Sequence, residues 1–183
     1  YSTMDGSSVE MKEIGPLPNG VTDKERPGDL YDWKDGDWAP NRHRIFQAKL
    51  AEINSQLKHR LEKGGFEALD TWHSSSQRAS TQIIAMRQSI RRDNFQGEDW
   101  ITLLGENIML KKEDVEELYR TGAQRTREIY TAFTVHKARI LSKNFKTEDL
   151  FSYDISREWP MSFTEYLESE KQALALTGSN EED

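Results

Sequence analysis

Hydrophobic positions between Lys111 and Lys143 recur at steps of three and four residues, the spacing of one face of an α-helix. Acidic residues gather near the beginning of this segment and basic residues near its end, as the helix dipole favours. A glycine, a threonine and a histidine interrupt the apolar face, which suits packing against several elements. The face consists of Val115, Tyr119, Gly122, Thr126, Ile129, Phe133, His136 and Ile140. We therefore predict a long helix at about 112–143.

Three further segments have helical periodicity and boundary signals. The first, 41–63, begins at Asn41, a suitable N-cap residue after a proline, and ends at a Gly-Gly pair. The second covers 74–92. The third covers 163–176 and follows a Ser-x-x-Glu capping box. The apolar stripes of the first two helices consist of Phe46, Leu50, Ile53, Leu57 and Leu61, and of Ile83, Met86 and Ile90.

Two stretches predict β-hairpins. In 31–38 an Asp-Gly pair supplies a tight turn, and Trp33 and Trp38 flank it, where they can pack together or cover a partner. In 100–110 two short apolar runs flank a Gly-Glu pair and lead directly into the long helix. A weaker alternation at 9–14 predicts a strand, which a proline-rich turn follows.

These elements predict a mainly α protein with small β-hairpins (α+β), in which amphipathic helices pack around the long helix. We expect an N-terminal segment at 1–40 that begins with a loose end, a helical domain at 41–144 with the hairpin 100–110 inserted, and a segment at 145–183. This last segment comprises an aromatic connector, a short helix and an acidic tail. Self-association through the apolar face of the long helix, giving a homo-oligomer, is the alternative to packing within one chain.

Composition excludes several classes of function. A net charge of -7 argues against a nucleic-acid-binding surface, so Arg87, Arg91 and Arg92 are expected to lie on a solvated helix face. The absence of cysteine excludes disulfides, zinc–thiolate sites and cysteine nucleophiles. No apolar run approaches the ~20 residues that a membrane span needs. No signal peptide is visible, which favours a cytoplasmic location.

The residues that could carry chemistry lack the partners that chemistry needs. His73 precedes three serines, but a catalytic triad is assembled in space, so we expect Ser74 or Ser75 to cap the helix and His73 to lie in a loop. Asp70 and His73 are only two ligands, too few for a metal site. His136 is expected to be a hydrogen-bonded histidine of the core or of an interface. We predict no catalytic residue, no cofactor and no metal.

A calcium loop is the nearest match to a known metal motif, and it fails. Asp32, Asp35 and Asp37 have the alternating spacing of such a loop, but the required glycine falls one position early. His43 stands where the twelfth-position glutamate belongs. Phosphate-binding and dinucleotide-binding loops are absent as well.

Two stretches resemble known proteins. Residues 15–22, followed by a proline and then by 33–38, are similar to bacteriophage tail-fibre assembly proteins, in which a Leu-Pro-x-Gly-x-Thr turn precedes a Trp-x-x-Gly-x-Trp hairpin. Residues 76–140 are similar to an uncharacterised helix–hairpin–helix domain family of phage tail proteins. The likeness covers roughly 9–141. It departs from the family pattern before the long helix, where lysines replace Thr or Ser, and the aromatic segment beyond it matches neither family.

The resemblance implies a non-catalytic phage protein that binds a tail-fibre or baseplate protein. It would act in the host cell cytoplasm during assembly, as a chaperone, or remain in the virion tail. Aromatic residues dominate the energetics of interfaces, so they are the candidate contacts, with burial in the protein's own core as the alternative for each. These candidates are Trp33, Trp38, Phe151, Tyr153 and Trp159.

Three other interpretations remain open. The chain begins with Tyr1 instead of Met, which suggests the C-terminal module of a longer tail-fibre polypeptide. A small hydrolase or metal enzyme built around Asp70 and His73 is a second alternative. A cytoplasmic helical adaptor of the host cell, unrelated to phage, is a third.

Overall fold

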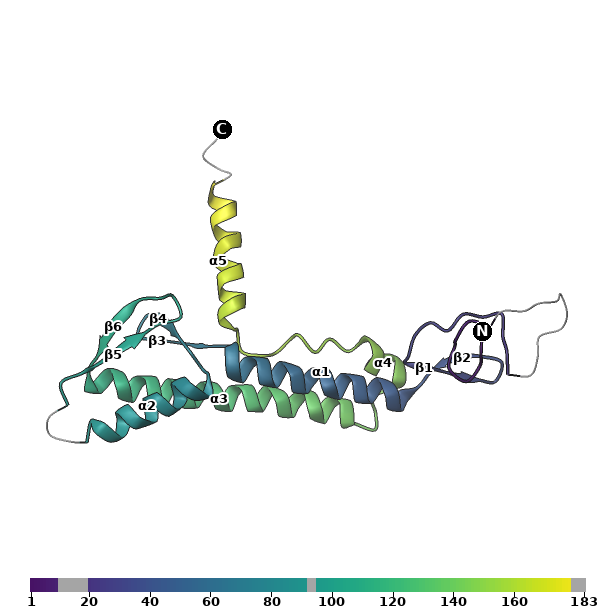
Figure 1. The fold of residues 1–183 in the computed structure, drawn as a ribbon, viewed down its shortest axis with the longest axis horizontal. Coiled ribbons are helices and arrows are strands. Elements are labelled where there is room, and N and C mark those ends of the chain that lie inside the picture. The colour runs from purple at the N-terminus through teal and green to yellow at the C-terminus, as the bar shows by residue number, and fades with distance from the viewer. Residues whose placement is uncertain (10–19, 92–94, 179–183) are drawn as a thin grey trace. The chain divides into compact units, whose positions relative to one another are not determined.

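The computed structural model describes residues 1–9, 20–91 and 95–178, and these contain five helices and three antiparallel strand pairs (Figure 1). The helices are α1 (Arg42–Lys63), α2 (Gln77–Ser89), α3 (Lys112–Leu141), α4 (Thr147–Ser152) and α5 (Phe163–Gly178). The strands are β1 (Tyr31–Lys34), β2 (Asp37–Pro40), β3 (Phe66–Ala68), β4 (Thr71–His73), β5 (Glu98–Ile101) and β6 (Asn107–Leu110). The fold is mainly α with small β-hairpins, as the sequence predicted.

Four sequence predictions fall outside the described residues. They are most of the strand at 9–14, the proline-rich turn at 15–19, the position of Arg92 and the acidic end at 179–183. Within the described part of the chain, no helix combines the length and apolar composition needed to cross a bilayer.

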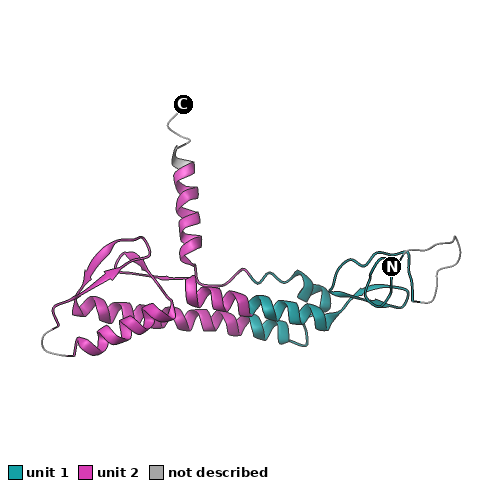
Figure 2. Ribbon diagram, in the orientation of Figure 1, with its two compact units in different colours: residues 1–53, 136–155 teal, residues 54–135, 156–183 magenta. Residues whose placement is uncertain are grey.

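The chain forms two compact units (Figure 2). Unit 1 contains residues 1–53 and 136–155, and unit 2 contains residues 54–135 and 156–183. This division differs from the three consecutive segments expected from the sequence, because α1 and α3 each contribute residues to both units.

Helix boundaries follow the local signals, with one correction. The Arg44 backbone N–H donates to Asn41 Oδ1 at 3.0 Å, so Asn41 caps α1 as predicted. Gly65 has a φ of 65°, a conformation that glycine adopts without steric cost, and it follows the end of α1. The prediction that Ser74 or Ser75 caps α2 is wrong: Ser76 is the N-cap, and its side chain accepts from the Ala79 N–H.

The core of unit 2 lies between α2, α3 and the two hairpins that precede α3. The apolar face of α3 contributes Val115 and Leu118, both with no exposed surface. Gly122 lies on the same face, where an added Cβ would come within 3.3 Å of the Phe66 ring. The buried cluster consists of Phe66, Ala68, Ala79, Ile83, Met86, Ile90, Trp100, Leu110, Val115 and Leu118. Thr126, predicted on the face, is exposed.

In unit 1, hydrogen bonds connect the beginning of the chain to residues 20–22. The Thr3 N–H donates to the Gly20 carbonyl at 2.8 Å, and the Thr22 N–H donates to the Tyr1 carbonyl at 2.7 Å. The prediction of a loose N-terminal end is therefore wrong. The Asp-Gly turn of the hairpin is confirmed, with positive φ values at both of its residues, as a two-residue hairpin turn requires.

Two elements were missed by sequence reasoning. Strands β3 and β4 form a hairpin whose turn residues, Leu69 and Asp70, have φ values of 51° and 58°. His73 is the last residue of β4 and is fully buried, so its predicted loop position is wrong. Helix α4 lies within the aromatic connector, where the Lys146 N–H donates to the Asp149 carboxylate at 3.1 Å.

Candidate protein-binding surfaces

The β5–β6 hairpin carries large apolar side chains on its outward face. Ile101 is 71% exposed and Met109 is 58% exposed. Residues of a strand alternate between its two faces, and the register pairs Asp99 with Met109 and Ile101 with Asn107. These four residues therefore share one face, and all of them are exposed. Leu104, in the loop of the hairpin, adds a third apolar side chain that is 48% exposed.

The opposite face of the β5–β6 hairpin packs into the core of unit 2, which fixes the position of the hairpin. Trp100 and Leu110 are buried in the core of unit 2. The Thr102 N–H donates to the Glu106 carbonyl at 2.9 Å and the Glu106 N–H donates to Thr102 Oγ1 at 3.1 Å, so the loop is internally hydrogen-bonded. The Leu103 N–H donates to the Trp72 carbonyl of the neighbouring hairpin at 2.7 Å. The apolar outward face is therefore presented on a fixed support, which lowers the entropic cost of binding a partner.

The predicted contact pair on the β1–β2 hairpin packs together. Trp33 and Trp38 face each other across the strands in a T-shaped arrangement, with ring centroids 5.3 Å apart. Trp38 is buried, its Nε1–H donates to the Lys24 carbonyl at 2.9 Å, and the Arg26 guanidinium lies 5.6 Å from its ring centroid. Trp33 is half-buried. Most of the surface of this pair thus contributes to the interior of unit 1.

The three remaining predicted contacts differ in exposure. Phe151 is 45% exposed and makes an edge contact with Tyr31. Tyr153 is half-buried in the same unit, whereas Trp159 belongs to unit 2 and is buried. That these five aromatic residues bind a partner stays a prediction, and Phe151 is the one among them that offers most surface.

His73, which the sequence analysis considered as a catalytic or metal-binding residue, uses both ring nitrogens in hydrogen bonds within the core. Its Nδ1 accepts from Trp100 Nε1–H at 3.0 Å, and its Nε2–H donates to the Ala68 carbonyl at 2.9 Å. Indole N–H only donates and a carbonyl only accepts, so this pair of partners specifies the neutral tautomer. Burial lowers the pKa of His73 below its usual 6.5, against the opposing effect of the bond to Ala68. Both ring nitrogens are thus engaged within the core.

His136 is buried and hydrogen-bonded as His73 is, and the carboxylates do not gather into a metal site among the described residues. His136 is fully buried in unit 1, and its Nδ1 lies 2.7 Å from the Tyr153 hydroxyl, which confirms the prediction of a hydrogen-bonded histidine. Among the residues that the structure describes, no three His, Cys, Asp or Glu side chains come together in a way that could hold a metal ion.

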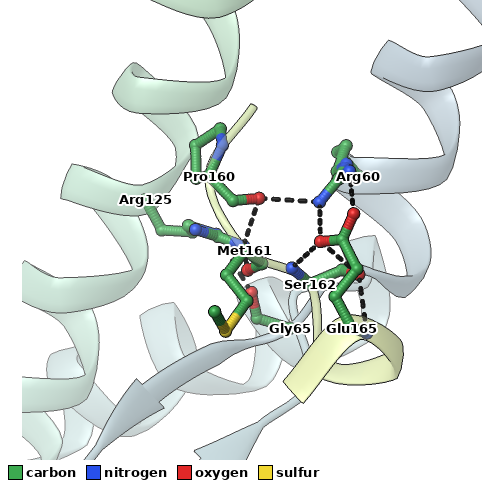
Figure 3. Close-up of polar contacts among 7 residues, drawn as sticks. All are labelled: Arg60, Gly65, Arg125, Pro160, Met161, Ser162 and Glu165. Atoms are coloured by element: carbon green, nitrogen blue, oxygen red, sulfur yellow. Dashed lines mark hydrogen bonds and ion pairs between the residues drawn. The ribbon is translucent and has the colours of Figure 1, made fainter. Parts of the chain in front are cut away.

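An ion pair and a capping box hold the first turn of α5 (Figure 3). Arg60 on α1 is 4% exposed, and its two terminal nitrogens each donate to an oxygen of Glu165 at 2.5 Å. The Ser162 N–H donates to the same carboxylate at 2.6 Å, and the Glu165 N–H donates to Ser162 Oγ at 3.3 Å, completing the predicted capping box. Burial raises the pKa of Glu165, but the bonds from Arg60 and Ser162 outweigh it and lower the pKa to about 2.

Arg125 also forms hydrogen bonds with the segment that leads into α5 (Figure 3). Arg125 on α3 donates to the carbonyls of Gly65, at 3.1 Å, and of Pro160 and Met161. We call the group of Arg60, Arg125, Ser162 and Glu165 the α5 latch. It links three stretches of unit 2 that are far apart in the sequence, and therefore determines where α5 begins and in which direction it runs.

An apolar groove lies between α2 and α3 in unit 2. Its cavity volume is about 290 Å³. Small residues, among them Ser80, Gly122 and Ala123, leave the space open, and Phe66 lies beside Gly122. Ile84 borders the groove and is 46% exposed. The groove is therefore an apolar concave surface that can receive another helix or side chain.

Comparison with known proteins gives one match. Residues 44–156 match the family described as "Domain of unknown function (DUF4376)". This range includes the β5–β6 hairpin and the α2–α3 groove, and it excludes the β1–β2 hairpin and α5. No curated protein and no solved structure matches the chain.

Proposed function

Because the chain belongs to the DUF4376 family, a family of domains of unknown function, we propose its role from its surfaces: it is a non-catalytic protein that binds another protein. The observation that carries the proposal is the apolar outward face of the β5–β6 hairpin. Ile101 and Met109 are mostly exposed on one face, and Leu104 is exposed in the loop of the same hairpin. Several exposed large apolar side chains on one rigid element are typical of sites for protein partners.

The positions of His73, His136 and Glu165 support a binding role over catalysis at these three groups. General acid–base and nucleophilic catalysis need a group that can reach a substrate. His73 and His136 are fully buried and hydrogen-bonded, and Glu165 is paired with Arg60. The proposed hydrolase built around Asp70 and His73 loses support, because the His73 ring nitrogens are occupied by Trp100 and Ala68.

The resemblance of 15–22 and 33–38 to tail-fibre assembly proteins supports a partner class. On that basis the partner is a bacteriophage tail-fibre or baseplate protein, bound in the host cytoplasm during assembly or in the virion tail. The alternative that this chain is the C-terminal module of a longer tail-fibre polypeptide predicts an intact mass in infected cells well above 21.3 kDa.

Co-expression with candidate tail-fibre and baseplate proteins tests this proposal. The chain would be purified by a tag, and the complexes separated by size-exclusion chromatography and identified by mass spectrometry. Covering a large apolar side chain stabilises a complex by about 1.5–3 kcal/mol. Ile101 and Met109 are already partly buried in the free protein, so covering the rest of both side chains should contribute about 2–4 kcal/mol, or a roughly 30- to 700-fold change in Kd.

The double variant Ile101→Asp/Met109→Asp removes this surface, and Asn107→Asp is the matched control on the same face. We expect the double variant to lose the fibre complex and the control to keep it, with both retaining the far-UV circular dichroism of the unaltered chain. Equal binding by both variants would show that the hairpin is not the contact. Failure of every candidate fibre and baseplate protein to bind would refute the partner class.

A further inference from the structure

Aromatic contacts add to the polar contacts of the α5 latch at the beginning of α5. The Tyr166 ring stacks on Trp72 of β4, with ring centroids 5.2 Å apart, and the Phe163 ring lies 5.7 Å from Trp72. Residues 168–175, by contrast, are all exposed. On the α5 side, these aromatic contacts and those of the α5 latch come from residues 160–166, which we call the anchor segment.

The anchor segment contacts a surface that lies within the family match, whereas the segment itself lies beyond it. The match covers residues 44–156. The surface, which we call the anchor site, consists of Arg60, Gly64, Gly65, Trp72 and Arg125. Figure 3 shows the segment beside Arg60 and Arg125. The family domain therefore provides the site, and a flanking part of the chain fills it, as an intramolecular ligand does.

Each part of the anchor site binds a different chemical group. Arg60 is 4% exposed and donates from both terminal nitrogens to the Glu165 carboxylate, a bidentate geometry that favours a carboxylate over other acceptors. Arg125 donates to two backbone carbonyls of the segment, and the Gly64 carbonyl accepts one of its backbone N–H groups at 2.7 Å. Trp72 offers an aromatic face. The ligand that fits is therefore a peptide that begins a helix with a glutamate between aromatic residues.

The anchor segment leaves two buried donors of the anchor site without a hydrogen bond. In the described part of the chain, Arg60 Nε and Trp72 Nε1 are the buried side-chain nitrogens that have no hydrogen-bond partner. Such a donor has lost its hydration without gaining a bond, which weakens the contact. The site can therefore be bound more tightly by a ligand that supplies further acceptors, and the anchor segment is a replaceable occupant.

We propose that the anchor site is a peptide-binding site, that the anchor segment occupies it in the free chain, and that a partner protein displaces the segment with one of the same chemistry. The anchor segment is part of the same chain, so it competes with an external peptide at an effective concentration on the order of 1 mM. Displacement thus needs a partner that binds better than the chain's own segment, and it releases α5. This inference is independent of the proposed fibre partner and of the β5–β6 hairpin.

A labelled peptide of residues 160–170, titrated into the full chain and followed by fluorescence anisotropy, tests the proposal. In the chain variant Glu165→Arg a second guanidinium lies beside Arg60 and should expel the anchor segment. We expect the peptide to bind this variant at least tenfold more tightly than the unaltered chain, where the anchor segment competes. Glu168→Arg, the same change at an exposed position, should bind the peptide as the unaltered chain does.

Peptide variants separate recognition by the anchor site from general stickiness. A peptide with Glu165→Gln should bind the Glu165→Arg chain at least tenfold more weakly, because it lacks the carboxylate for Arg60. A peptide with Glu168→Gln should bind like the original peptide. Equal binding of the original peptide to the unaltered and Glu165→Arg chains would place it elsewhere, and no binding to a folded Glu165→Arg chain would mean that the contact is only internal packing. Either result would overturn the proposal.

A second experiment leaves the anchor site and the anchor segment unaltered. A protease site is inserted between Arg157 and Glu158, which are exposed, and the full chain is cut after it has folded. We expect the C-terminal fragment to stay bound in size-exclusion chromatography and to be displaced by excess peptide of residues 160–170. A fragment that leaves at once and does not rebind, or one that no concentration of peptide displaces, would contradict the proposal.

Discussion

Replacing Glu165 with glutamine removes the negative charge of the α5 latch while keeping the size of the side chain. In the unaltered protein the carboxylate accepts two bonds from Arg60 and two from Ser162, one from its N–H and one from its hydroxyl. The variant leaves the Arg60 guanidinium, which is 4% exposed, without its counter-charge. Breaking a buried ion pair in this way is destabilising because the remaining charge cannot regain its hydration.

The lowered pKa of Glu165 gives the size of the contribution that its carboxylate makes to the free energy of unfolding. It is lowered from 4.5 to about 2, so the carboxylate stabilises the folded state fully above pH 4.5, and the stabilisation is lost as the pH falls towards 2. The full difference corresponds to about 3 kcal/mol. The Glu165 side chain is 43% exposed, so solvent screening reduces the expected contribution to about 1–2 kcal/mol.

Urea unfolding at pH 7 and pH 3, followed by circular dichroism, measures this contribution. The matched control is Glu168→Gln, the same chemical change at an exposed position one turn further along α5. At pH 7 we expect Glu165→Gln to be about 1–2 kcal/mol less stable than the control, with faster hydrogen exchange in the first turns of α5. The difference in stability between the two variants should fall by more than half at pH 3. Equal stability of the two variants at pH 7, or a gap unchanged at pH 3, would refute this account of the latch.

Two further predictions address the core and a turn. His73→Phe leaves Trp100 Nε1–H and the Ala68 carbonyl without a partner, and we expect a loss of about 2–4 kcal/mol in urea unfolding. Because the pKa of His73 is lowered, the unaltered protein should also lose stability as the pH falls below 6.5, and the variant should lack that component. Gly36→Ala places a Cβ at a φ of 82° and should cost about 1 kcal/mol in thermal unfolding, whereas Lys34→Ala on the same hairpin should change it little.

Local signals were sufficient for most of the helices. The four-three spacing of apolar residues predicted α3 and α1 to within about two residues, and Asn41 and Ser162 were identified as caps. The β3–β4 hairpin was missed because each strand has three residues and its turn uses Leu69 and Asp70, without the glycine or asparagine that marks such turns.

The candidate binding surface was harder to predict than the fold. Apolar runs in 100–110 indicated strands but not which side chains would face outward. Trp100 and Ile101 are adjacent and both apolar, yet the first is buried and the second is 71% exposed. The aromatic residues chosen from the sequence include Trp38 and Trp159, which the fold buries, because large aromatic side chains serve cores and interfaces equally well.

The sequence by itself determined the helices α1, α2, α3 and α5, the Asp-Gly hairpin and the α5 capping box, since each depends on residues within a few positions of one another. Only the tertiary structure decided which polar groups pair across the chain. Arg60 and Glu165 are 105 residues apart, and His73 and Trp100 are 27 apart. Their contacts depend on how whole elements pack, and hydrophobic burial, which drives that packing, is non-directional and leaves no local pattern for the pairs it brings together.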